Sequence, residues 1–166
     1  MTERIKASVL ASQVLLSLGG ETISEIYRNQ IRTLRTRKYE LRAPAAGASV
    51  EVLHTLLGIE LRMGKRRVHC PDLATARYLL VFARLGCQDV AVPYDITRIA
   101  LLAHDLETSW HRMLALANSV SQDRGRNFQR KLERTLISRL LEELTAIGSG
   151  PDRPEFVQDT RQRRRK

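Results

Sequence analysis

The sequence predicts an α+β fold organised around residues 37–93. Three observations predict it: four short runs alternate apolar and polar side chains, two longer runs have helical periodicity, and turn residues separate the runs. Strict alternation is typical of an antiparallel sheet with one buried and one solvated face. In chain order, the runs predict strand, helix, strand, strand, helix, strand.

This order is the split βαβ arrangement of a ferredoxin-like core, in which a four-stranded antiparallel sheet carries both helices on one face. The first run, for example, alternates apolar Tyr39 and Leu41 with charged residues. The pair Gly64–Lys65 between the second and third runs suits a two-residue hairpin turn with glycine first. The four expected strands are residues 38–42, 59–63, 66–70 and 89–92.

Two core helices are expected between these strands. The first covers residues 50–57, with Ser49 as its N-cap. The second follows Asp72 as N-cap and ends at Gly86, both common helix boundary residues. Because residues 78–82 are apolar nearly all round the helix, we expect the second helix to lie between the sheet and a further layer of helices.

Helical hairpins are expected on both sides of the core. A first helix ends at Gly19–Gly20, and Thr22 with Glu25 forms a capping box that begins the next helix. After the core, a long helix to about Asn118 and a last helix over residues 126–146 form the second hairpin. The expected organisation is one compact domain with an N-terminal helical hairpin (1–36), the core (37–93), a C-terminal helical hairpin (94–148) and a disordered basic tail (149–166).

The charge of the chain is concentrated in two segments. The 166 residues have a net charge of +10. Residues 28–42 contain six basic and one acidic side chain, and residues 124–166 contain twelve and six, whereas residues 43–123 balance at eight each. Such segregation predicts a surface that binds a polyanion.

Composition also narrows the class of protein. The two cysteines do not form a disulfide framework, so buried free thiols are expected. No apolar run approaches the roughly 20 residues that span a bilayer, and no signal peptide is recognisable. We therefore expect a cytoplasmic protein without a membrane partner.

Arginines on the second helix form the clearest candidate binding surface. Arg28, Arg32 and Arg35 are spaced four and three residues apart, which places them on one side of a helix. Positive charge continues into the expected sheet, whose solvated face would be basic, and a second group lies at the start of the last helix. The candidate nucleic-acid-binding residues are Arg28, Arg32, Arg35, Lys38, Arg42, Arg62, Arg67, Arg126, Arg130 and Lys131.

Candidate catalytic and metal-binding residues are few. His104, Glu107 and His111 share one helix face, but no second helix offers the histidines that would complete a zinc or iron site, so a polar stripe with a Glu107–His111 pair is expected. Phosphate-binding loops, dinucleotide fingerprints and nucleophile elbows are absent from the sequence. The sequence predicts a protein with neither enzymatic activity nor a cofactor or metal.

These patterns favour a nucleic-acid-binding protein, with RNA slightly preferred over DNA. The expected solvated sheet face offers Arg67 and His69 rather than the aromatic side chains on which RNA-recognition motifs stack bases. Recognition would therefore rest mainly on phosphate contacts. The alternative is an assembly or regulatory module that forms a homodimer or binds an acidic protein partner.

Overall fold

The computed structural model describes residues 5–44 and 49–147 and has a mixed α+β fold, as predicted. The expected tail, residues 149–166, lies outside the described residues. The helices are α1 (Ala7–Leu18), α2 (Ile23–Ile26), α3 (Leu73–Arg84), α4 (Ile96–Ser121) and α5 (Arg126–Ile147), with a 3-10 turn η1 (Gly19–Glu21) and a π-helix η2 (Tyr27–Ile31). The strands are β1 (Thr36–Glu40), β2 (Val50–Thr55), β3 (Gly58–Met63), β4 (Arg66–Cys70) and β5 (Asp89–Pro93).

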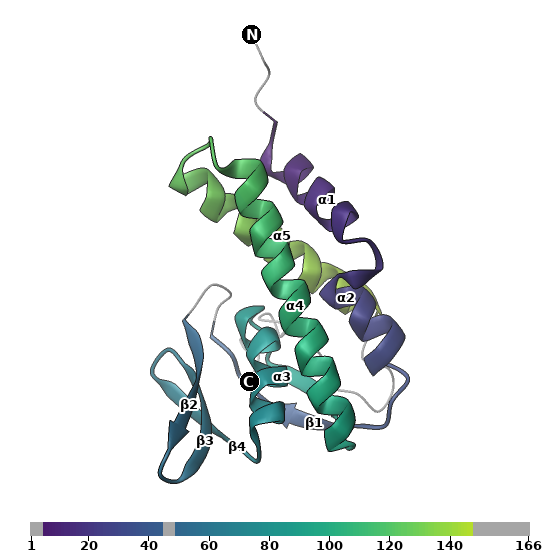
Figure 1. The fold of residues 1–166 in the computed structure, drawn as a ribbon, viewed down its shortest axis with the longest axis vertical. Helices are drawn as coiled ribbons and strands as arrows, with labels where there is room; N and C mark the ends of the chain where they lie inside the picture. The colour runs from purple at the N-terminus through teal and green to yellow at the C-terminus, as the bar shows by residue number, and fades with distance from the viewer. Residues whose placement is uncertain (1–4, 45–48, 148–166) are drawn as a thin grey trace, which may run out of the picture.

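The strands form two small antiparallel sheets, so the prediction of a single four-stranded, ferredoxin-like sheet was wrong. One sheet pairs β1 with β5, and the other is a β2–β3–β4 meander (Figure 1). Within the described residues no backbone ladder joins the sheets. Side chains link them instead: the Tyr39 hydroxyl donates to the His69 carbonyl at 2.7 Å, and the Arg66 guanidinium donates to the Arg42 carbonyl at 3.1 Å.

Residues 50–57 form strand β2 and a turn, not the expected helix. Val50 and Val52 pair with Met63 and Leu61 of β3, and this pairing supplies the backbone hydrogen bonds that a helix would otherwise make internally. Valine also favours a strand because its branched side chain packs well on a pleated sheet. The leucines that suggested a helical face, Leu56 and Leu57, lie exposed in the β2–β3 turn.

Strand β1 begins and ends two residues earlier than expected. It pairs Thr36–Glu40 with β5, and Tyr39 lies opposite Val90. Arg42 follows the strand with φ of 48°, in the left-handed region that non-glycine residues rarely adopt. The Arg42 side chain therefore does not belong to the regular strand face on which it was expected.

Helix α3 is the central element of the core, as its apolar sequence predicted. It packs against α4 on one side and against strands of both sheets on the other. Tyr78 and Phe82 are fully buried, and the Tyr78 hydroxyl donates to the carbonyl of Ala91 in β5 at 2.7 Å. Gly86 follows the helix with φ of 82°, which only glycine adopts without strain.

The N-cap residue Asp72 provides a direct test of where α3 begins. Asp72 accepts hydrogen bonds from the Thr75 backbone N–H at 2.7 Å and from the Thr75 hydroxyl at 3.1 Å. We expect Asp72→Ala to lower the free energy of unfolding by about 1–2 kcal/mol, because both bonds are lost. Urea denaturation measures the change, and Asp72→Asn, which keeps an accepting oxygen, is the control. Equal losses in both variants would contradict the capping role.

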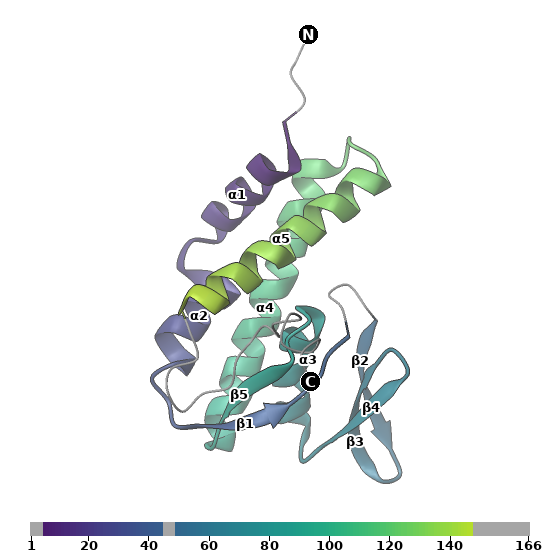
Figure 2. The ribbon, with the colours of Figure 1, turned by 180° about the vertical axis from the view of Figure 1, so that it is seen from behind.

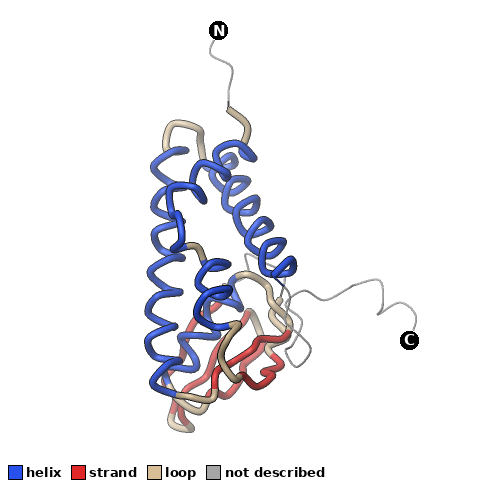
Figure 3. Tube along the Cα trace, turned by 90° about the vertical axis from the view of Figure 1, so that its right-hand side faces the viewer, coloured by secondary structure: helices blue, strands red, loops and turns tan. Residues whose placement is uncertain are grey.

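The remaining helices form a bundle at the other end of the molecule. Helices α1, α4 and α5 pack against one another, and α4 runs the length of the structure from β5 to the start of α5 (Figures 1 and 2). Strands occupy one end and the helical bundle the other (Figure 3). A single hydrophobic cluster extends from Leu10 in α1 to Ile147 in α5. None of the helices in residues 5–44 and 49–147 has the length and apolar character needed to cross a membrane.

Candidate nucleic-acid interface

The structure separates the ten candidate residues into three groups. The first group surrounds η2 and β1, the second lies on or beside the meander sheet, and the third is on the first half of α5. The members are Arg28, Arg32, Arg35 and Lys38 in the first group, Arg42, Arg62 and Arg67 in the second, and Arg126, Arg130 and Lys131 in the third.

Acidic neighbours balance the charge of the second group. Arg62 forms an ion pair with Glu51, which lies directly opposite it in the β2–β3 register. Arg67 lies 3.7 Å from Glu60, and Arg42 lies 3.3 Å from Glu40. Exposed pairs of this kind contribute little stability, but they cancel the local positive potential. The candidate residues of the second group therefore form a poorer polyanion surface than the basic sheet face expected from the sequence.

The first group is partly neutralised and no longer follows one helical stripe. Helical structure ends with η2, so Arg35 lies in the connection to β1, where its guanidinium carbon is 5.3 Å from the centre of the Tyr94 ring. Arg28 pairs with Glu25 at 3.8 Å, and Lys38 pairs with Asp89 at 3.4 Å. In the described part of the chain, Arg32 has no ion pair.

The third group keeps its positive charge exposed. Arg126, Arg130 and Lys131 are all exposed, and none has an ion pair within the described residues. The loop that precedes them is held by Arg124, which donates to the Ile5 carbonyl at 3.1 Å and stacks over Phe128 at 4.1 Å. The third group therefore lies at a defined position next to the N-terminus of α1.

The position of these cations on their helix strengthens the local positive potential. Arg126 lies in the first turn of α5, where unpaired backbone N–H groups and the helix dipole already favour an anion, and Arg130 and Lys131 follow in the second turn. The first turn of α5 contains no acidic side chain that would offset them. Cations at this position cost helix stability, and such a local conflict is typical of a functional surface.

Two further exposed cations adjoin the candidate groups. Arg134 continues the third group one turn beyond Arg130, and Arg98 lies in the first turn of α4, four residues after Tyr94. The i, i+4 spacing of Arg126, Arg130 and Arg134 was visible in the sequence. The position of Arg98 close to Arg35 could not be seen in the sequence, because it depends on the stacking of Arg35 over Tyr94.

Glu107, one of the three residues considered for metal binding, is paired with an arginine instead. The Glu107 carboxylate accepts two hydrogen bonds from Arg77 of α3, at 3.0 Å from Nε and 2.6 Å from the terminal nitrogen, rather than pairing with His111. The hydrogen bonds with Glu107 raise the pKa of Arg77. Within the described residues no three potential ligands form a metal-binding group.

The two cysteines are not activated nucleophiles. Cys70 and Cys87 are buried and unpaired, and burial raises the pKa of both thiols. A reactive cysteine instead needs a lowered pKa and access to solvent. His69, the neighbour of Cys70, lies on the opposite, exposed face of β4, as alternation predicted.

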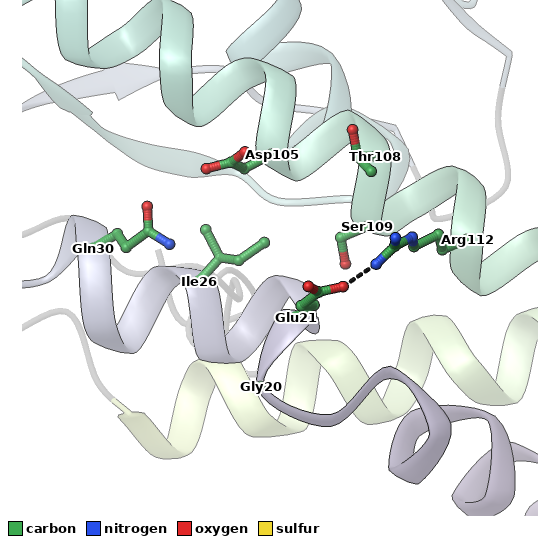
Figure 4. Close-up of a pocket in the computed structure, with 8 residues that line it drawn as sticks. All are labelled: Gly20, Glu21, Ile26, Gln30, Asp105, Thr108, Ser109 and Arg112. Atoms are coloured by element: carbon green, nitrogen blue, oxygen red, sulfur yellow. Dashed lines mark hydrogen bonds and ion pairs between the residues drawn. The ribbon is translucent and has the colours of Figure 1, made fainter.

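A cleft of about 270 Å³ opens between α2 and α4 (Figure 4). Glu21 and Arg112 face each other across it in an ion pair, and Asp105 adds a second carboxylate from α4 (Figure 4). The guanidinium is already occupied by Glu21, so the acidic side chains would repel a phosphate. The cleft is unsuited to a nucleic acid.

No protein-family model, curated protein or solved structure matches this chain.

Proposed function

We propose that this protein is a non-enzymatic nucleic-acid-binding protein whose principal contacts are made by the first half of α5. The observation that supports the proposal is the contrast between the groups of candidate residues: Arg42, Arg62 and Arg67 are paired with carboxylates, whereas Arg126, Arg130 and Lys131 are exposed without ion pairs in the described residues. Arg134 extends this surface, which we call the α5 stripe.

Contacts of the α5 stripe would be mainly with phosphates. Arg126, Arg130 and Arg134 follow one another at intervals of about 6 Å along the helix axis, given a rise of 1.5 Å per residue. The only aromatic side chain of α5, Phe128, is half-buried against Arg124 and does not offer a stacking platform. Phosphate contacts position a protein without reading bases, so sequence preference should be weak. The proposed preference for RNA is examined by comparing RNA and DNA of the same sequence.

Salt dependence tests this mode of binding. Four phosphate contacts give a slope of log affinity against log salt of about −3 for single strands to about −4 for duplex DNA. Affinity should then fall by about 50- to 150-fold between 50 and 200 mM salt. Arg126→Gln with Arg130→Gln removes two contacts and should reduce the magnitude of the slope by about 1.4–1.8, measured by fluorescence anisotropy.

A matched control separates a local site from net charge. Ala115→Glu with Asn118→Glu changes the net charge by the same two units but lies on an exposed, uncharged part of α4. The control should retain the slope of the unmodified protein. If both double variants changed the slope equally, the α5 stripe would not be the binding site. The absence of binding at 50 mM salt would overturn the proposed function.

A second candidate is an assembly module, favoured by one observation. Leu56 and Leu57 are adjacent at the β2–β3 turn and have relative exposures of 107% and 85%. A protein partner that covered these two side chains would remove their apolar surface from water, which favours association. Sedimentation at several protein concentrations, with and without polynucleotide, separates this function from nucleic-acid binding.

A further inference from the structure

We infer that one copy of this protein holds two nucleic-acid segments at once, one at each end of α4. The inference rests on the proposed nucleic-acid binding and adds a second site and a bridging function to it. The first site is the α5 stripe. The second, which we call the β1 end, is formed by Arg32, Arg35, Arg37 and Lys38 together with Arg98.

The two sites lie at opposite ends of one rigid helix. The β1 end adjoins the start of α4, because Arg35 stacks over Tyr94 and its carbonyl accepts from the Tyr94 backbone N–H at 3.3 Å. The α5 stripe begins just after α4 ends (Figure 1). Helix α4 has 26 residues and is therefore about 39 Å long. The stripe covers about 12 Å of α5, from Arg126 to Arg134.

The β1 end has enough cations for a site of its own. Residues 32–38 contain four basic side chains and no acidic one. Lys38 has a carboxylate neighbour, Asp89, whereas Arg32 and Arg37 are exposed without ion pairs among the described residues. Arg35 remains exposed while it stacks on Tyr94, so its charge is available to a phosphate.

One side of the molecule between the sites has few charges. Helix α1 contains no charged residue along its 12 residues. After Arg98, the exposed charged side chains of α4 are those of Asp105 and Arg112, and Arg112 is paired with Glu21. The other exposed residues on the outer face of α4 are uncharged when histidine is neutral: Thr97, Ala100, Leu101, His104, Thr108, His111, Ala115 and Asn118. Among the described residues, a polyanion that ran along this side would meet no unpaired cation between the two sites.

The side formed by η1, α2 and the second half of α5 is acidic. Its exposed or half-buried carboxylates are those of Glu21, Glu25, Glu142 and Glu143. The arginines in this region are engaged within the protein. Arg28 pairs with Glu25 at 3.8 Å, Arg112 pairs with Glu21, and Arg139 donates to the Ser12 hydroxyl and, at 2.9 Å, to the Ser8 carbonyl. Because like charges repel, these carboxylates separate the basic sites instead of joining them.

Two isolated cationic sites on one rigid body favour bridging over wrapping. A single strand or duplex gains counterion release at either site but gains little along the two sides described above. Two segments can occupy the sites without approaching each other, because α4 holds the sites apart. The protein should therefore bring separate nucleic-acid segments together, which raises their effective concentration relative to each other.

A capture experiment tests the inference with the full chain. A biotinylated RNA duplex is immobilised, the protein is added, and retention of a second, fluorescent duplex is measured at about 0.1 M salt. The unmodified protein should retain the second duplex. Arg32→Gln with Arg35→Gln, and separately Arg126→Gln with Arg130→Gln, should each reduce retention by about tenfold or more, since two lost contacts weaken one site. Each variant should still bind one duplex in solution.

The outcomes distinguish this inference from the proposed function. Failure of the protein to bind any duplex would overturn both. Binding of a single duplex without retention of the second would overturn bridging alone. Retention that persists in the Arg32/Arg35 variant would also overturn it, because the bridge would then be made by two copies that each use the α5 stripe. Sedimentation of the free protein at the assay concentration identifies such a dimer.

Discussion

Replacing Phe82 with alanine is expected to lower the free energy of unfolding by about 3–5 kcal/mol. Phe82 is fully buried in α3, and its ring centre lies 5.2 Å from that of Tyr78. Helix α3 packs between α4 and the sheets, so the cavity left by the ring has rigid walls that cannot close around it. The loss is a large part of the roughly 5–15 kcal/mol that stabilises a typical domain.

Trp110 provides the measurement, because it is the only tryptophan of the chain. It is 7% exposed on α4, and the guanidinium carbon of Arg84 in α3 lies 5.8 Å from the centre of its ring. Its fluorescence should therefore report separation of α3 from α4 during urea denaturation. Leu73→Ala is the matched control, since Leu73 lies on the same helix but is 40% exposed. Similar losses for the two variants would contradict the central position of α3.

Helix α3 was predictable from the sequence because its signals are local. Asp72 caps it, Gly86 follows it, and the apolar run between them requires burial on both sides. The same holds for α4, where Asp95 accepts from the Thr97 backbone N–H at 3.0 Å, and for the alternating strands β3 and β4. In each case the residues that determine the element lie within it.

Residues 50–57 were not assigned correctly because their pattern fits two structures. Val52, Leu53, Leu56 and Leu57 can form one face of a helix, whereas Val50 and Val52 can face the core from a strand. The choice depends on β3, which offers Met63 and Leu61 as partners. Pairing between strands likewise decides that there are two sheets, and alternation within a strand does not reveal its neighbour.

The candidate site was predictable as far as the position of charge along the chain. Exposed cations were expected on α5, and the structure exposes Arg126, Arg130 and Lys131 there. The pairing of Arg62 was not predictable, because Glu51 meets Arg62 only when residues 50–55 form a strand. The separation of the two basic ends depends on how α4 packs, which is a property of the whole fold.

Replacing Leu140 with alanine is expected to lower the free energy of unfolding by about 2–5 kcal/mol. Leu140 is 1% exposed in α5, and α5 packs against α1 and α4 at the end of the molecule away from the sheets. One hydrophobic cluster joins this bundle to the packing around α3. The variant should therefore shift the unfolding of the whole protein. Trp110, which lies on α4 between the two regions, should report the same shift. Exposed Ser138→Ala in the same helix is the control.

Two spectroscopic probes test this cooperativity. Urea transitions followed by Trp110 fluorescence and by far-ultraviolet circular dichroism should coincide in the Leu140 variant, as they do for a two-state domain. If the circular dichroism transition split while the fluorescence transition stayed in place, the α1–α4–α5 bundle would unfold on its own. Helix α4 would then not hold the α5 stripe at a fixed distance from the β1 end, and the structural basis for a rigid bridge would be lost.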